Sequence, residues 1–256
     1  CAPLTLNVTP PYWILVEAIT VKSAKGIPVT SLLPLELGGV DVKVKLCSSY
    51  FDTSRVEVNA TVVSVGGPPI RCVNPLNVSA VTDANGRAIV HFTVLASNAT
   101  GSTTITLNLT TTGYNRLIEV PVHVDSFKPV VKVVYVEAGP TLVLKAVYSS
   151  SGEPVEGRGD LLEFTISYMV NPIPVDDEGL AVVVLSHDVL ERALRGGGAL
   201  TITLSYRSTP IPGLLRRLTI RVERLVTTIH EVVDAGDYVV YTGQVTLTNS
   251  TGIPGV

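Results

Sequence analysis

The densest group of metal-ligating side chains in this sequence is a run of three carboxylates. Hard oxygen ligands of this kind suit Ca²⁺, so calcium is the one cofactor that the sequence leaves open. The spacing is not that of an EF-hand loop, and the same run also fits a solvated acidic turn between two strands. The residues of this weak calcium candidate are Asp176, Asp177 and Glu178.

Histidine, which serves both catalysis and metal binding, occurs four times in the chain. His91 and His123 occupy polar positions of alternating stretches, where we expect solvated side chains. The sequence contains no HExxH motif, no Gly-x-Ser-x-Gly elbow and no phosphate-binding P-loop. We therefore predict that the protein is not an enzyme.

The three cysteines allow several disulfide pairings. Cys47 and Cys72 flank a loop with adjacent glycines and prolines, and a bridge that closes this loop would stabilise the fold by ~3 kcal/mol. We predict this pair, although the sequence leaves pairings with Cys1 open. Cys1 itself fits either a lipid-modified residue or the residue at which removal of a signal peptide happened to fall.

Asn-x-Ser/Thr sequons occur six times, which is more than this composition produces by chance. The excess favours an N-glycosylated extracellular protein. The alternative is that asparagine is simply frequent in turns and threonine in strands. The sequon asparagines are Asn7, Asn59, Asn77, Asn98, Asn108 and Asn249.

The composition points to a β-protein with an unusual surface. Of 256 residues, 46% are hydrophobic and only 16% are charged, against about 25% charged in a typical soluble domain. The apolar residues fall in short stretches, and none approaches the ~18 residues of a membrane-spanning helix. A net charge of −3 gives no electrostatic footprint for nucleic acid.

Two short elements recur along the chain and both contain a turn. The first, a strand followed by Gly-x-Pro and another strand, spans 18–29, 144–155 and 244–255. Glycine supplies a positive φ there, and proline fixes φ before the next strand. The second, an acidic turn followed by Gly-x-Ala and an alternating strand, spans 83–94 and 177–185. Its first copy contains an Asn-Gly dipeptide, a strong hairpin signal.

Strict alternation of apolar and polar residues marks the segments between these turns, as in 40–46, 103–110 and 200–206. Short alternating strands at regular spacing predict an all-β fold of tandem immunoglobulin-like sandwiches. We place the first sandwich at 1–125 and the second at 126–225.

One short helix is expected, in the second sandwich. Ser186 can cap a helix over 189–195, and the glycines at 196–198 end it.

Residues 226–256 exceed what two sandwiches require. The strand-like stretch 239–248 repeats the opening of both sandwiches. It fits a piece of a third sandwich in a longer chain, a donor strand that completes a sandwich in a neighbouring subunit, or a strand that packs back on the second sandwich. The residues of the proposed intersubunit strand are Val239, Val240, Tyr241, Val245 and Leu247.

With its two recurring turns, the chain resembles the tandem prokaryotic immunoglobulin-like domains of invasin/intimin-type cell-surface proteins. It also looks similar to the subunits of archaeal S-layers and extracellular filaments. The acidic turn of the second sandwich keeps the glycine and alanine of this pattern but lacks the asparagine. The resemblance implies a secreted protein on the cell surface.

We therefore predict a structural, glycosylated cell-surface protein, an S-layer or filament subunit that self-associates through sandwich contacts. The alternative is an adhesin or carbohydrate-binding region of a larger secreted protein. Such a region would use exposed aromatic side chains, for which the sequence offers the pairs 12–13 and 50–51, and Tyr114. Within the first pair, Trp13 opens an apolar strand, so we expect it in the core.

Overall fold

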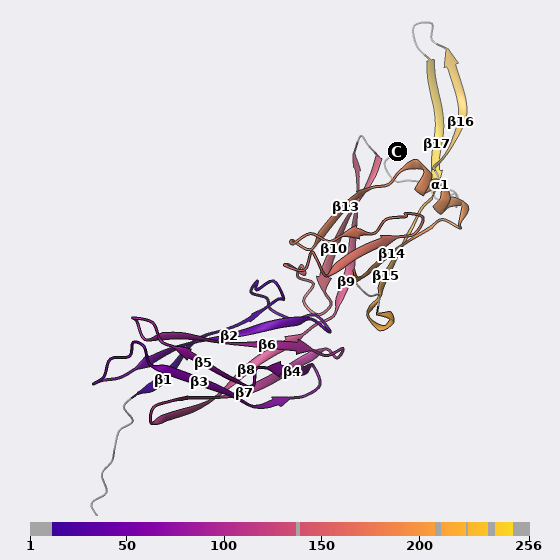
Figure 1. Cartoon of the computed structure of the whole chain (residues 1–256). Helices are drawn as coiled ribbons and strands as arrows, with labels where there is room; N and C mark the ends of the chain where they lie inside the picture. The colour runs from indigo at the N-terminus through magenta and orange to yellow at the C-terminus, as the bar shows by residue number, and fades with distance from the viewer. Residues whose placement is uncertain (1–11, 137–138, 208–210, 224, 235–238, 248–256) are drawn as a thin grey trace, which may run out of the picture. The chain divides into compact units, whose positions relative to one another are not determined.

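The structure is a computed structural model that describes residues 12–136, 139–207, 211–223, 225–234 and 239–247 (Figure 1). This part of the chain consists of β-strands with one α-helix and one 3₁₀ turn, which confirms the all-β class. The chain divides into two compact units. Unit 1 runs to Phe127 and also includes Val147–Arg158 and Asp177–Gly179, and unit 2 comprises the remainder. The sandwich boundaries expected from the sequence stay a prediction.

Unit 1 contains two four-stranded sheets, with strand orders β1-β2-β6-β4 and β5-β3-β7-β8. One buried apolar core draws on the strands of both sheets. The strands are β1 (Trp13–Lys22), β2 (Leu37–Cys47), β3 (Glu57–Gly66), β4 (Ile70–Asn74), β5 (Asn77–Val81), β6 (Arg87–Ala96), β7 (Gly101–Thr111) and β8 (Tyr114–Val124).

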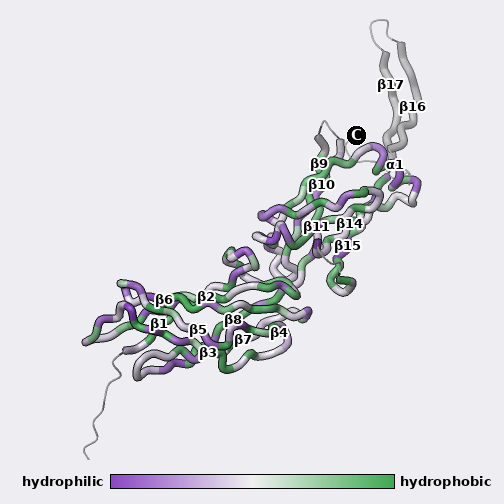
Figure 2. The backbone as a smooth tube through the Cα atoms, in the orientation of Figure 1, coloured by the Kyte–Doolittle hydropathy of each residue, from purple (hydrophilic) through white to green (hydrophobic). Residues whose placement is uncertain are grey.

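The alternation read from the sequence decides which side chains enter this core. In β2, Val42 and Val44 are fully buried, while Lys43 between them is exposed. β6 pairs with β2 in the same phase, so Val90 and Phe92 are buried beside them. Hydrophobic and hydrophilic positions are accordingly interspersed along the strands (Figure 2).

Unit 2 also contains two sheets, with strand orders β13-β10-β9 and β12-β11-β14-β15, and a separate two-stranded sheet, β16-β17. Leu144 of β10, Phe164 of β11 and Ile202 of β14 are fully buried. The strands are β9 (Phe127–Val136), β10 (Gly139–Tyr148), β11 (Leu162–Ile166), β12 (Ile173–Pro174), β13 (Leu180–Val184), β14 (Ala199–Tyr206), β15 (Arg216–Arg221), β16 (Leu225–Asp234) and β17 (Val239–Leu247). A 3₁₀ turn, Pro212–Leu214, precedes β15.

The short helix is confirmed as α1 (His187–Arg195), which joins β13 to β14. The Ser186 side chain accepts a hydrogen bond from the Val189 amide, and Gly196 ends the helix. The cap satisfies one of the amides that a helix leaves unpaired at its start.

In both recurring turns, the glycines adopt the positive φ that the sequence predicts. In the Gly-x-Pro turns, φ is +78° at Gly26 and +75° at Gly152. In the acidic turns, φ is +71° at Gly86 and +79° at Gly179. The third Gly-x-Pro copy, at 252–254, lies outside the described residues.

The predicted disulfide between Cys47 and Cys72 is wrong, because both are free thiols. Cys47 ends β2, whereas Cys72 pairs with Leu95, and Leu95 also pairs with Leu37 at the start of β2. Ten residues of β2 therefore separate the two positions along the sheet, roughly 30 Å at the rise of an extended strand. A disulfide requires Cα atoms within ~7 Å. Cys1 lies outside the described residues.

The turn glycines of unit 1 provide a matched test of this account. A Cβ at Gly86 would lie 2.5 Å from Thr53 Oγ1, whereas one at Gly26 would meet nothing within 4 Å. We expect Gly26→Ala to cost about 1–2 kcal/mol through its positive φ alone. Gly86→Ala should cost about 1–3 kcal/mol more, because the clash adds to the same strain. Urea unfolding of the two variants measures the difference, and equal losses would contradict the account.

Candidate functional site

The acidic run at 176–178 does not gather into a calcium site. Asp176 Oδ1 accepts a hydrogen bond from the Leu180 amide at 2.6 Å and so holds its own hairpin turn. Asp177 Oδ1 instead lies 2.8 Å from the Lys25 ammonium. Within the described residues, no group of three His, Cys, Asp or Glu side chains is placed to hold a metal ion. The calcium candidate is therefore corrected: two of its carboxylates serve a turn and an ion pair.

The two acidic turns, 83–86 and 176–179, share this use of an aspartate as an acceptor for turn amides. Asp83 Oδ1 accepts hydrogen bonds from the amides of Asn85 and Arg87, at 2.8 and 2.9 Å. These two backbone bonds hold the pKa of Asp83 below its usual value. Asp176 stands three residues before its glycine, as Asp83 does, so Asp176 is the structural counterpart of Asp83.

A fully buried ion pair, which the sequence did not indicate, lies in unit 1. Arg158 Nη2 lies 3.0 Å from Glu36 Oε2, and both side chains have 0% exposure. Arg158 Nη2 also donates to the Ser31 carbonyl at 2.8 Å, and Glu36 Oε2 accepts from the Leu33 amide at 2.7 Å. Glu36 Oε1 and Arg158 Nε have no hydrogen-bond partner among the described residues. Such a pair tolerates the loss of one member poorly, because the other charge would remain buried.

The segment that carries Arg158 is held by further polar contacts within unit 1. The Tyr148 hydroxyl donates to the same Ser31 carbonyl at 2.8 Å, and its ring lies 6.0 Å from the Arg158 guanidinium carbon. Asp125 accepts a hydrogen bond from the Ser150 amide at 3.1 Å. The segment folds back on itself because Gly152 turns the chain and Pro154 bridges to Val147.

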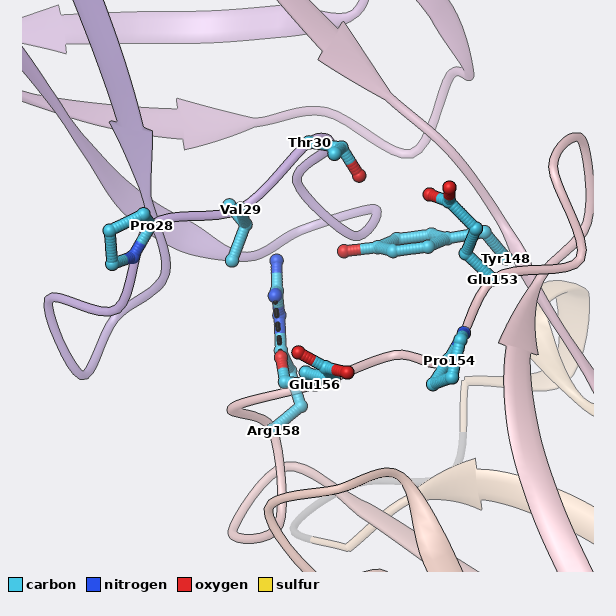
Figure 3. A pocket seen from close by; sticks show the side chains of 8 residues that line it. All are labelled: Pro28, Val29, Thr30, Tyr148, Glu153, Pro154, Glu156 and Arg158. Atoms are coloured by element: carbon cyan, nitrogen blue, oxygen red, sulfur yellow. Dashed lines mark hydrogen bonds between the residues drawn. The ribbon is translucent and has the colours of Figure 1, made fainter.

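A cavity of about 280 Å³ lies beside this ion pair (Figure 3). The Tyr148 hydroxyl and the Arg158 guanidinium point into it, and Glu153 and Glu156 line it as exposed side chains. Arg158 is already neutralised by Glu36 and held by carbonyls, so the cavity offers no unpaired cation to an anionic ligand. The arrangement anchors the segment.

Burial raises the pKa of Tyr148 to about 12, and the nearby Arg158 only partly opposes this effect. The neutral phenol is therefore the form that the fold stabilises.

The predicted core position of Trp13 is wrong, since the side chain is 41% exposed. Alternation along β1 directs Ile14 into the core and leaves Trp13 and Leu15 on the outer face. Trp13 pairs with Cys47, which leads into the loop that carries Tyr50 and Phe51.

The two aromatic pairs seen in the sequence meet at one end of unit 1. The rings of Tyr12 and Phe51 lie 5.8 Å apart, and the Tyr12 hydroxyl donates to the Asp52 carbonyl at 3.4 Å. Tyr50 is 87% exposed and Phe51 is 56% exposed. We call three of these residues the aromatic cluster: Tyr12, Tyr50 and Phe51. Trp13 lies on the outer face of its sheet. Tyr114, like Tyr12, packs against the core.

An open groove of about 600 Å³ lies at the same end, between the loops 48–56 and 82–86. The loops are joined by hydrogen bonds between Thr82 and residues 53, 55 and 56. Arg55 adopts a φ of +56°, a left-handed conformation that is uncommon for a residue with a side chain. The groove is lined by Asp52, Ser54, Arg55, Thr82, Asp83 and Ala84.

The histidines of unit 1 lie in polar pairs. His91 Nδ1 lies 2.6 Å from Asp41 Oδ1 on the outer face of its sheet, and His123 Nδ1 lies 2.9 Å from the Ser102 hydroxyl. Burial raises the pKa of Asp41, but hydrogen bonds from Lys22 and His91 outweigh it and lower the pKa below its usual value.

Three sequon asparagines gather on the outer face of one sheet of unit 1. Thr61 of β3 lies opposite both Asn77 of β5 and Asn108 of β7, and Asn59 stands two residues from Thr61 on the same face. Asn98 is exposed in the connection from β6 to β7. The remaining two sequons, Asn7 and Asn249, lie outside the described residues.

No protein-family model and no curated protein matches the chain. Among solved structures, it is similar to the adhesin InvE of Yersinia pseudotuberculosis, with 14% identity, 86% of this chain and 66% of that chain covered, and a TM-score of 0.28. Domains 5–6 of the S-layer protein SbsC match with 17% identity and a TM-score of 0.26. The match covers 81% of this chain and 97% of that chain. A β-glucuronidase of Bacteroides uniformis matches with 13% identity and a TM-score of 0.25. The match covers 80% of this chain and 25% of that chain. Scores this low carry no argument about function.

Within the described residues, no helix combines the length and the apolar character needed to cross a membrane.

The buried ion pair can be tested by a double-mutant cycle. Arg158→Met leaves the Glu36 carboxylate buried without its partner, and we expect the free energy of unfolding to fall by about 3–5 kcal/mol. Adding Glu36→Leu should restore much of the loss, because no buried charge then remains. Urea unfolding measures Arg158→Met, Glu36→Leu and the double variant.

Lys25→Met is the matched control, since it removes the partly exposed ion pair with Asp177. It should cost at most about 1 kcal/mol. A double variant whose loss equals the sum of the two single losses would contradict the coupling of Glu36 and Arg158.

Tyr148 should be visible in an alkaline titration of the folded protein. Its phenol should ionise near pH 12, separately from tyrosines with ordinary pKa values, and Tyr148→Phe should remove that step. Because the folded pKa is raised, the stability from the neutral phenol is present below pH ~10 and is lost as the pH rises toward 12. Absorbance near 295 nm follows the ionisation, and a titration unchanged by the substitution would contradict the assignment.

Proposed function

We propose that this chain belongs to a glycosylated, non-enzymatic protein of the cell surface, of the S-layer or extracellular filament type known from archaea. In this proposal its β-sandwiches form a scaffold, and copies of the chain self-associate outside the cell. β17 adds to a sheet of a neighbouring copy.

The observation that carries the proposal is the two-stranded sheet formed by β16 and β17 (Figure 1). The pairing runs from Leu225 opposite Leu247 to Asp234 opposite Val239. Within the described residues, no third strand joins this sheet. An isolated two-stranded hairpin is marginally stable in water, and its unpaired edges are templates for another strand. A neighbouring copy would supply the missing partner.

The positions of the sequons support the extracellular part of the proposal. Asn77 and Asn98 are exposed, and Asn59 and Asn108 are half-buried on an outer face. Glycans attached there would extend into solvent without disturbing the core. The pairing of β3 with β5 and β7 places three of these asparagines within a few residues of one another.

A second candidate function is recognition, as an adhesin or a carbohydrate-binding region. The exposed aromatic cluster favours it, because large aromatic side chains left in water are typical of surfaces that bind a partner. This function would be compatible with the scaffold, since loops at the end of a sandwich are free to vary while the sheets hold them.

Electron microscopy of the native material tests the leading proposal. We expect ordered sheets or fibres from the wild-type chain and isolated particles from the variant Tyr241→Lys/Val245→Lys, because lysines on an edge strand oppose strand addition. Thr106→Lys, on the half-buried outer face of β7, is the control and should assemble normally. Isolated wild-type particles, or normal assembly of the double variant, would overturn strand addition by β17.

A further inference from the structure

We propose that the loop end of unit 1 binds a neutral oligosaccharide, with the aromatic cluster stacking on the sugar rings and the groove beside it binding their hydroxyls. The inference rests on the second candidate function and names its ligand class. It does not depend on assembly by β17.

The aromatic cluster provides the apolar half of such a site. Tyr50 and Phe51 are more than half exposed, in a loop that presents them at the end of the sandwich. The contact between Phe51 and Tyr12 fixes one ring against the body of the unit. Faces of aromatic rings pack well on the C–H faces of sugars, and their rigidity keeps the entropic cost of binding low.

The groove provides the polar half. Hydrogen bonds from the Ser54 amide and hydroxyl lower the pKa of Asp52, just as backbone amides lower that of Asp83. Both groups are therefore carboxylates at neutral pH and can accept hydrogen bonds from sugar hydroxyls. Arg55 lines the same groove and supplies donors.

The two halves are continuous because Asp52 belongs to both. Its carbonyl accepts from the Tyr12 hydroxyl, its side chain lines the groove, and it follows Phe51 in the chain. A ligand that spans them needs an apolar face and many hydroxyls in one molecule, which is the chemistry of a saccharide.

Among the side chains that line the groove, the two carboxylates of Asp52 and Asp83 outnumber the single guanidinium of Arg55. This balance disfavours an acidic saccharide or a phosphate, so the proposed ligand is neutral.

The backbone of Arg55 agrees with a binding role. Its positive φ is unfavourable in a residue with a side chain, yet the Arg55 amide is held by the Thr82 carbonyl at 3.0 Å. Arg55 lines the groove between the two loops, and backbone strain of this kind is common at ligand-binding sites.

Calorimetry of the full chain tests the proposal with a defined panel of maltohexaose, cellohexaose, chitohexaose and mannopentaose, with a polygalacturonate oligomer as the acidic comparison. We expect saturable binding of at least one neutral oligosaccharide and none of the acidic one. Emission of Trp13, the single tryptophan of the chain, should change with the same saturation curve.

Variants locate the site. Tyr50→Ala/Phe51→Ala should weaken binding about tenfold or more, because it removes two stacking surfaces. Asp83→Asn should also weaken it while keeping an oxygen for the turn amides. Leu117→Ala, which trims an exposed apolar side chain on β8, is the matched control and should bind normally.

Absence of binding by every neutral oligosaccharide up to about 10 mM, or binding unaffected by both site variants, would overturn the proposal. Binding of a peptide or protein by the aromatic cluster, lost in Tyr50→Ala/Phe51→Ala while no oligosaccharide binds, would overturn it in favour of a protein ligand. Assembly seen by microscopy would be unaffected by any of these results, so failure of this site and failure of the scaffold proposal are distinguishable.

Discussion

The antiparallel register of β2 between β1 and β6 is the constraint on which unit 1 depends. Each side chain of β2 alternates between core and solvent, so a slip of one residue would expose Val42 and Val44 and bury Asp41 and Lys43. The glycine turns fix this register, because a positive φ reverses the chain within a few residues. The hydrogen bond from the Leu46 amide to the Gly86 carbonyl ties β2 directly to the acidic turn. This alternation of buried and exposed positions along β2 therefore determines which side chains form the core and which face solvent.

The buried pair of Glu36 and Arg158 shows a different kind of constraint. Removing two charges from water is costly, and an apolar pair of similar volume would stabilise a fold at least as well. The pair does fix a geometry, because the planar guanidinium of Arg158 can donate to the Ser31 carbonyl and the Glu36 carboxylate in only one orientation. The segment Val147–Arg158 is therefore held in one arrangement within unit 1, although it lies between strands of unit 2 in the chain.

Scaffold and recognition use separate parts of the chain in the proposed functions. The sheets are rigid because their inner faces are close-packed, and their outer faces present short polar side chains, including three sequons. The loop that carries Tyr50 and Phe51 presents large aromatic side chains to solvent. A sandwich can thus form an assembly through its strands and still bind a ligand at its end.

The sequence by itself determined what depends on local rules. Alternation predicted the strands of β2 and β7, the glycines predicted the turns at Gly26 and Gly86, and Ser186 predicted the helix start. It failed where distant strands meet. Cys47 and Cys72 are close in sequence yet lie far apart along the sheet, and Trp13 faces solvent because Ile14 takes the core position. In the acidic run, Asp176 accepts a hydrogen bond within its turn, and Asp177 forms an ion pair with Lys25. Glu36 with Arg158, and the meeting of Tyr12 with Phe51, were decided by the tertiary structure alone, because pairings between residues far apart in the chain leave no periodic signal in it.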